Sequence, residues 1–163
     1  MIILGLDPGL QNTGWGVIKV VGSNLKHIAN GVIKTNNTDA LSDRLAHIFN
    51  SLNTIINDFK PDEAAVEETF MNNNPRSALK LGEARGVVLL APAHLKVPVF
   101  EYAANKIKKA VVGVGHADKL QIQSMIEIIF PGCEFSSPDA ADALAIAVCH
   151  ANHRETNKIW LAN

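Results

Sequence analysis

Long apolar runs, cysteines and targeting signals are scarce or missing in this chain. No stretch approaches the roughly 18 apolar residues of a membrane-spanning helix, and no basic segment precedes Ile2, so we expect neither a membrane helix nor a secretory signal. The only cysteines, Cys133 and Cys149, lack the paired spacing of a disulfide framework or a zinc site. These absences predict a cytoplasmic protein with reduced thiols.

Several familiar catalytic motifs are missing as well. The six histidines show no H-E-x-x-H spacing, and the chain has neither a Walker A loop nor a nucleophile elbow. What is present is 163 residues with 47% hydrophobic content, enough for one domain with a real core. Any chemistry must therefore be carried by less conspicuous groups.

The net charge of −1 conceals an uneven distribution of charge along the chain. Residues 72–119 contain eight Lys and Arg against three Asp and Glu, whereas both flanking segments are acidic. A basic segment beside an acidic cluster suits a polyanion held over a cation site. A solvated lysine-bearing helix is the more common explanation, and charge alone favours it.

Hydrophobic periodicity and turn signals predict an α/β protein. Bounded apolar runs indicate strands and apolar residues at steps of three or four indicate helices. The predicted strands are 2–7, 13–20, 26–34, 64–67 and 97–102, and the predicted helices are 42–59, 77–91, 103–111, 119–130 and 137–152. Three strands joined by short turns, followed by alternating helix and strand, predict a mixed sheet of about five strands with the first and fourth inside it.

Two acidic side chains end predicted strands. Asp7 ends the first strand and Glu67 ends the fourth, so the two carboxylates meet if these strands are neighbours. Asp7 has an ordinary alternative, in which it starts the Pro8-Gly9 turn through its own hydrogen bonds. Glu68 is the alternative to Glu67, but strand alternation sends only one of them to the shared face, and we choose Glu67.

Two more acids lie at the start of the last helix. Asp139 and Asp142 are three residues apart and therefore share one helix face. Acids in a first turn are also ordinary helix-start chemistry, which in isolation is the preferred explanation. The small apolar residues that follow predict a helix packed closely on the sheet, which would bring both acids to its edge.

Four carboxylates in one crevice repel one another. Two unit charges about 4 Å apart at an effective dielectric near 20 cost roughly 4 kcal/mol. Bound cations remove this cost, and carboxylate oxygens suit Mg²⁺, with Mn²⁺ as an alternative. Two such ions activate water and stabilise the leaving oxygen in phosphodiester cleavage.

Four blocks of the sequence resemble a known family. GLDPGLQNTGWGV, VEETFMNNNPRSALKLGEARG, PVFEYAANKIKKAVVGVGHADK and DAADALAIA are similar, in order, to motifs of RuvC-type Holliday junction resolvases. The resemblance implies a ribonuclease-H-like fold, a homodimer, and Mg²⁺-dependent paired nicking of four-way junction DNA with the RuvA and RuvB branch-migration proteins as partners. It extends to about His150, so we expect a single nuclease domain over 1–152 and a short tail over 153–163.

The resemblance also assigns roles to individual positions. The family's acids fall on Asp7, Glu67, Asp139 and Asp142. Its junction-contacting aromatic falls on Phe70, for which the alternative is an anchor that holds the loop on the core. The DNA-binding candidates are Phe70, Lys108 and Lys119, with Lys109, Arg76 and Lys80 as weaker ones. The tail carries less positive charge than that of some relatives.

Other functions remain to be separated by experiment. The D-x-G start resembles the first phosphate loop of actin-like ATPases and sugar kinases, but 163 residues cannot supply the second domain of that fold. A nuclease of the same fold that acts on RNA, and a catalytically silent junction-binding module, are two further alternatives. Gly82 and Gly86 share one helix face, which predicts close packing on the sheet or on a second copy.

Overall fold

The strands form one mixed sheet in the order β3-β2-β1-β4-β5. The computed structural model describes residues 1–68 and 74–161, with side chains up to residue 154. The strands are β1 (Ile2–Asp7), β2 (Asn12–Val21), β3 (Asn24–Lys34), β4 (Glu63–Glu68) and β5 (Val99–Ala103). The first three pair antiparallel, and β1, β4 and β5 pair parallel. The predicted mixed sheet, with the first and fourth strands inside it, is therefore confirmed.

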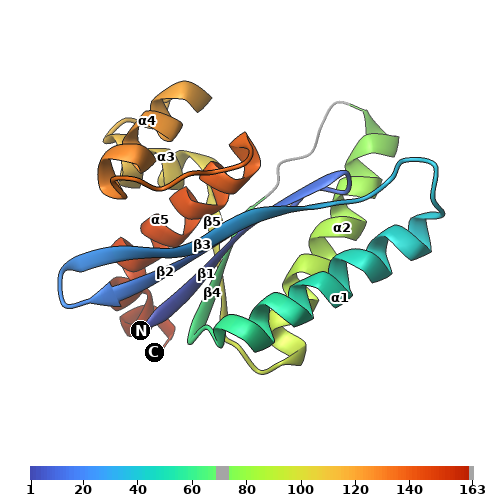
Figure 1. The fold of residues 1–163 in the computed structure, drawn as a ribbon, viewed down its shortest axis with the longest axis horizontal. Coiled ribbons are helices and arrows are strands. Elements are labelled where there is room, and N and C mark those ends of the chain that lie inside the picture. Colours follow the sequence, from blue (N-terminus) through green and yellow to red (C-terminus); the bar gives the residue numbers. More distant parts are fainter. Residues whose placement is uncertain (69–73, 162–163) are drawn as a thin grey trace.

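Helices cover both faces of the sheet (Figure 1). They are α1 (Leu41–Phe59), α2 (Pro75–His94), α3 (Ala104–Val112), α4 (Lys119–Ile129) and α5 (Pro138–Leu161). One hydrophobic cluster joins the sheet to α1 and α2, and a second joins it to α3, α4 and α5. The central strand β1 contributes Leu4 and Leu6 to one cluster and Ile3 to the other, as expected of a strand buried on both faces.

Glycines on β1 and β2 allow α5 to lie almost directly on the backbone of the sheet. A Cβ at Gly5 would clash with the carbonyl oxygen of Ala143, and one at Gly14 would clash with that of Asp139. The helix meets this surface with alanines that are fully buried, such as Ala143 and Ala147. Small residues on both sides thus fix the first turn of α5 against the end of β1.

The structure corrects three predicted helix boundaries. Helix α2 is capped by Asn74, whose side chain accepts hydrogen bonds from the backbone N–H groups of Arg76 and Ser77, so the prediction that Ser77 is the cap was wrong. The same helix runs through Pro92 to His94. Helix α5 continues to Leu161, past the end predicted near Asn152.

No helix in the described part of the chain combines the length and the apolar character that crossing a membrane requires.

Candidate active site

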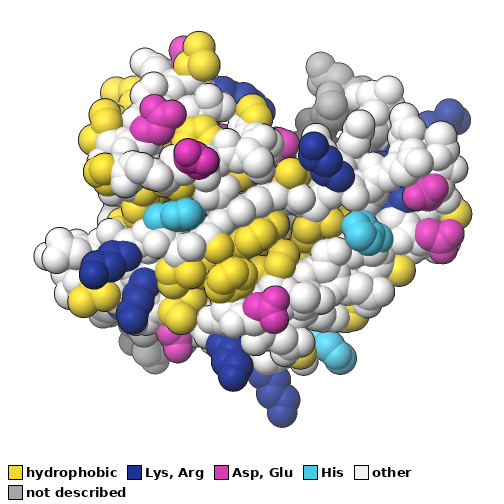
Figure 2. Space-filling model, viewed as in Figure 1, with side chains coloured by type: hydrophobic (Ala, Val, Ile, Leu, Met, Phe, Trp, Pro, Cys, Tyr) yellow, Lys and Arg dark blue, Asp and Glu magenta, His cyan; other side chains and the backbone are white. Residues whose placement is uncertain are grey.

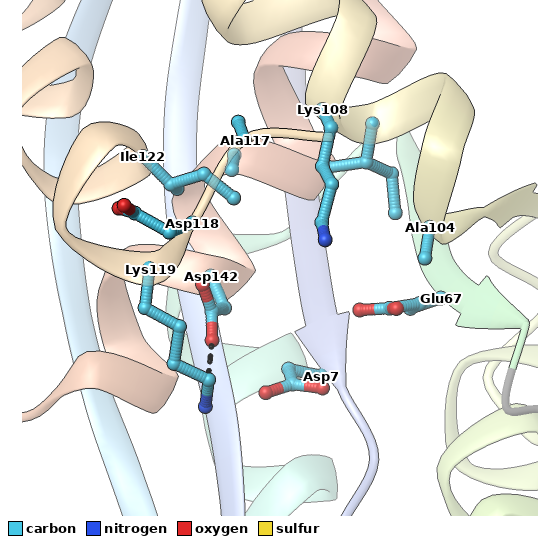
Figure 3. A pocket seen from close by; sticks show the side chains of 11 residues that line it. Asp7, Glu67, Ala104, Lys108, Ala117, Asp118, Lys119, Ile122 and Asp142 are labelled. Carbon is cyan, nitrogen blue, oxygen red and sulfur yellow. Dashed lines mark ion pairs between the residues drawn. The ribbon is translucent and has the colours of Figure 1, made fainter. Parts of the chain in front are cut away.

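Two acidic side chains meet because β1 and β4 are parallel neighbours. Leu6 is paired with Val66, so the next residue along each strand, Asp7 and Glu67, reaches the same edge of the sheet. Their side chains lie near each other in Figure 3, and both line one cavity. Glu68 is exposed and does not line that cavity, as strand alternation predicted.

The first turn of α5 brings two further acids to this edge. Ser137 accepts a hydrogen bond from the backbone N–H of Ala140 at 3.3 Å, which fixes the start of the helix. The backbone of Asp139 packs on Gly14, the cross-strand partner of Asp7. Asp142, one turn later, lines the same cavity as Asp7. The two uses of this turn, as a helix start and as an acidic pair beside Asp7, are therefore compatible.

The cavity has a volume of about 550 Å³ and lies between the sheet edge and the helices α3, α4 and α5. Figure 2 shows the molecule hollowed between the part built from α3 and α4 and the start of α2. The lining residues are Asp7, Glu67, Ala104, Ile107, Lys108, Ala117, Asp118, Lys119, Ile122, Asp142 and Ala145. The lining therefore combines four acids, two lysines and several apolar side chains, and Lys119 lies directly beside Asp142.

The pKa of Asp7 is raised from 3.8 to about 8. Burial of the carboxylate is the largest cause, and the negative charges of Glu67, Asp142 and Asp139 raise it further. The charge of Lys119 opposes this shift. An acid that loses its proton only near pH 8 is poised to exchange that proton for a metal cation at physiological pH.

Two more acids of the cavity, Glu67 and Asp142, show the same direction of shift. Burial raises the pKa of Glu67 and of Asp142, and each is raised further by a neighbouring carboxylate. Lys119 partly compensates, because its Nζ lies 3.7 Å from Oδ2 of Asp142 (Figure 3). Asp139 lies just outside the cavity lining, but its charge raises the pKa of both Asp7 and Asp142.

The donor set suits hard divalent cations. Carboxylate oxygens are the ligands that Mg²⁺ and Mn²⁺ prefer, and the raised pKa values report negative charge that a bound cation would neutralise. Among the described residues, no group of three or more His, Cys, Asp and Glu side chains is arranged so that it could hold one metal ion.

The predicted cations divide into three groups. Lys108 and Lys119 line the cavity and extend into it in Figure 3. Lys109 is exposed on α3 outside the lining. Arg76 and Lys80 are exposed on the first turns of α2, away from this cavity. Phe70 lies outside the described residues.

Sequence reasoning missed the walls of the cavity. Ile107 and Ile122 come from different helices and form its apolar part. Their helical spacing was visible in the sequence, but the closeness of α3 and α4 was not. Asp118 was also overlooked: with Gln121 it forms a capping box that starts α4 and sets Lys119 in the first turn.

Known proteins match this chain over nearly its whole length. The profile of the family described as "Crossover junction endodeoxyribonuclease RuvC" matches residues 3–150. The chain belongs to the RuvC family. A relative of that name from Paramagnetospirillum magneticum is 56% identical, with 97% of this chain and 95% of the relative covered. Another, from Sphingopyxis alaskensis, is 56% identical and covers 94% of this chain and 99% of its own length.

Solved structures agree with the family assignment. The structure of T. thermophilus RuvC in complex with Holliday junction substrate superposes with a TM-score of 0.88 at 34% identity, covering 96% of each chain. A second T. thermophilus RuvC structure gives a TM-score of 0.85 at 32% identity and covers 96% of this chain and 97% of that one. The ribonuclease-H-like fold predicted for the sequence is thereby confirmed. The actin-like alternative has no support from these relatives.

Proposed function

We propose that this chain is a metal-dependent endodeoxyribonuclease that resolves four-way DNA junctions by paired symmetric nicks in recombination and DNA repair. The observation that carries the proposal is one cavity whose lining brings together the acids Asp7, Glu67 and Asp142 and the cations Lys108 and Lys119. A relative of 34% identity has been solved in complex with a Holliday junction substrate. Acids that can hold cations, together with lysines that line the same cavity, suit a phosphodiester bound there.

Each group has a proposed role in cleavage. Asp7, Glu67, Asp139 and Asp142 are the proposed catalytic and metal-binding acids. Lys108 and Lys119 neutralise the scissile phosphate and hold it beside the acids, because both cations line the cavity. Phe70 is a proposed DNA contact that stacks on an unpaired base, and Lys109, Arg76 and Lys80 are proposed contacts to more distant phosphates.

We infer that the cofactor is Mg²⁺, at two ions per site, with Mn²⁺ as a substitute. Asp7 and Glu67 would hold one ion between β1 and β4, and Asp7 with Asp142 or Asp139 the other. When bound, the two ions activate a water and stabilise the leaving oxygen. The supporting observation is that three neighbouring acids have raised pKa values. Their ionised forms are therefore unfavourable in the metal-free protein, and bound cations would stabilise them.

The proposed assembly is a homodimer, because a two-fold junction requires two active sites for symmetric nicks. The proposed interface is the face of α2 that carries Gly82 and Gly86. A Cβ at either glycine would meet nothing within 4 Å, so these glycines do not pack on their own sheet. On the same face Leu79 is 65% exposed and Leu90 is 55% exposed.

The interface has a direct test. Gly86→Glu should convert a dimer into a monomer in light scattering while the circular dichroism spectrum stays unchanged. Lys19→Glu, on the exposed part of β2, is the matched control and should remain dimeric. A Gly86→Glu variant that is as dimeric as the control would exclude this face.

The remaining parts of the proposal concern location and partners. We place the protein in the cytoplasm, consistent with two free cysteines and with family members that are named for cleaving DNA. RuvA and RuvB are the proposed partners, which would deliver junctions to the dimer. Co-sedimentation of the three proteins on a synthetic junction, with and without this chain, measures that association.

One assay separates the proposed activity from its alternatives. The protein is incubated with Mg²⁺ and an end-labelled four-way junction, a plain duplex or a structured RNA of equal length. Paired nicks at symmetric positions in the junction alone support the proposal. Cleavage only of the RNA would favour the ribonuclease alternative, and junction binding without any product would favour the silent binding module.

A further inference from the structure

A second cavity lies beyond the β1–β2 turn that follows Asp7. It has a volume of about 270 Å³ and is formed by four segments of the chain: the β1–β2 turn, the connection from β3 to α1, the first turn of α1, and the first turns of α2. Its lining residues are Leu10, Gln11, Asn37, Arg44, Ser77, Lys80 and Leu81. The lining contains two cations and no acid, in contrast to the cavity around Asp7.

Arg44 is the unusual member of this set. Its residue is only 9% exposed, yet it lines the cavity. Its Nε donates a hydrogen bond to Oγ1 of Thr35 at 2.9 Å, and its Nη2 donates to the carbonyl oxygen of Leu10 at 3.4 Å. Among the described side chains, no carboxylate forms an ion pair with it. A buried cation that is compensated only by neutral acceptors is costly and favours an external anion.

The surroundings of Arg44 are fixed before any ligand arrives. Oγ1 of Thr35 donates a hydrogen bond to the carbonyl oxygen of Leu10 at 2.5 Å. The backbone N–H of Thr35 donates a second one to the carbonyl oxygen of Gln11 at 3.0 Å. These bonds tie the β1–β2 turn to the end of β3. The guanidinium is therefore held in place by hydrogen bonds and loses little conformational entropy when it binds an anion.

The cavity is close to the proposed site of cleavage. Leu10 is three residues after Asp7, so their Cα atoms are separated by at most about 11 Å. In Figure 1 the β1–β2 turn, the start of α1 and the start of α2 lie at the same end of the sheet as the end of β1. This cavity is therefore within a few nucleotides' reach of a strand held over Asp7.

We propose that the cavity formed by Arg44, Lys80, Ser77, Asn37 and Gln11 binds one phosphate of the cleaved DNA strand, a few nucleotides from the scissile phosphate. Arg44 supplies a buried, planar guanidinium whose several N–H donors suit phosphate oxygens. Lys80 supplies a second charge from the exposed rim, and the three polar side chains supply hydrogen-bond donors. This proposal rests on the proposed function.

The contact would fix the register of the strand. A phosphate seated in this cavity is attached through the strand to the one facing Asp7, so it sets which phosphodiester reaches the acids. Contacts of this kind position a nucleic acid without reading its sequence. They also limit the loss of cleavage efficiency that follows from a small displacement of the reacting group.

The test replaces single phosphates by neutral methylphosphonates along the strand, moving outward from the cut. Junction binding is measured with Ca²⁺ in place of Mg²⁺, which prevents turnover. The wild-type chain should lose affinity at least about 10-fold at one position outside the scissile phosphate, the value expected for a charge-assisted contact. Lys80→Gln should bind the unmodified junction more weakly and should lose less affinity than the wild type at that same position, because only Arg44 then faces the phosphate.

Two further variants guard the interpretation. Arg44→Lys keeps the charge but removes the fork, and it should also suppress the loss at that position if it folds, which thermal unfolding measures. Lys19→Gln, an exposed lysine at the opposite end of β2, should retain the full wild-type loss. The salt dependence of junction binding is an independent measurement. Because Lys80→Gln removes one phosphate contact, it should reduce the steepness of log affinity against log salt concentration by about 0.9.

The outcome separates this proposal from the proposed function. If the wild-type chain nicks junctions with Mg²⁺ but Lys80→Gln loses as much at every methylphosphonate position as the wild type, the cavity does not hold a phosphate. If the wild-type chain neither nicks nor binds a junction, the proposed function itself fails.

Discussion

Replacing Asp7 by asparagine should make the metal-free protein more stable. The pKa of this carboxyl is about 8 in the folded chain against 3.8 in its ordinary state, chiefly because it is buried. The folded protein therefore binds more protons than the unfolded chain between these two pH values, and the free energy of unfolding falls as the pH rises through that window. Asparagine has no ionised form and removes this penalty.

The magnitude follows from the same shift. Each pKa unit corresponds to about 1.36 kcal/mol, so at pH 7 ionisation of Asp7 stabilises the unfolded chain by at most about 4 kcal/mol, whereas the folded chain keeps this carboxyl mostly protonated. Glu67 and Asp142 are also partly buried and titrate together with Asp7, so the shift does not belong to Asp7 alone. We therefore expect Asp7→Asn to raise the free energy of unfolding by about 2–4 kcal/mol. The gain should vanish below pH 3.8 and reach its full value near pH 8.

Urea unfolding in EDTA at several pH values measures the gain. Asp58→Asn, an exposed acid on α1, is the matched control and should change the free energy of unfolding by less than about 0.5 kcal/mol. Adding Mg²⁺ should stabilise the wild-type chain and narrow the difference, since a ligand of the native state adds its binding free energy. An Asp7→Asn variant that is less stable than the wild type at pH 7, or a gain that does not change with pH, would refute the reasoning.

Three further outcomes follow from the geometry. At low Mg²⁺ the nicking rate should rise with pH up to about 8, because Asp7 must lose its proton, and higher Mg²⁺ should move the midpoint to lower pH; a flat profile would contradict this. Lys119→Gln removes the charge 3.7 Å from Asp142, so single-turnover nicking should fall at least 10-fold and its pH midpoint should rise. Gly5→Ala would force a Cβ against Ala143 and should destabilise the fold by about 3 kcal/mol in urea unfolding, whereas Gly22→Asn, in open space on a turn, should cost less than about 1 kcal/mol.

The acids could be placed from the sequence because each follows a simple structural rule. Asp7 and Glu67 end short apolar strands, and parallel neighbouring strands end at the same edge of a sheet. The acids of α5 follow a Ser-Pro start, and the alanines behind them indicated close packing on the sheet. Each of these local patterns has one dominant physical consequence, so the positions predicted from them agree with the structure.

Other features depend on contacts between segments that the sequence does not relate. Asn74 and Ser77 are both good helix caps, and in the structure the cap is Asn74, followed by a proline at the start of the helix. The apolar part of the active-site cavity requires α3 and α4 to lie side by side, and the spacing of apolar residues in the sequence does not predict that contact. Arg44 appears in the sequence as one charge on an amphipathic helix, and only the turn beside it reveals that it is buried.

The central claim is that acids brought together from β1, β4 and α5 perform metal-dependent cleavage of a junction. Single-turnover nicking of a labelled four-way junction by wild type and Asp7→Asn, with binding measured in parallel in Ca²⁺, tests it most directly. We predict symmetric nicks by the wild type, a loss of at least about 10³-fold in the variant, and junction affinity within about 3-fold of wild type. An Asp7→Asn variant that nicks at the wild-type rate with Mg²⁺ would contradict the claim.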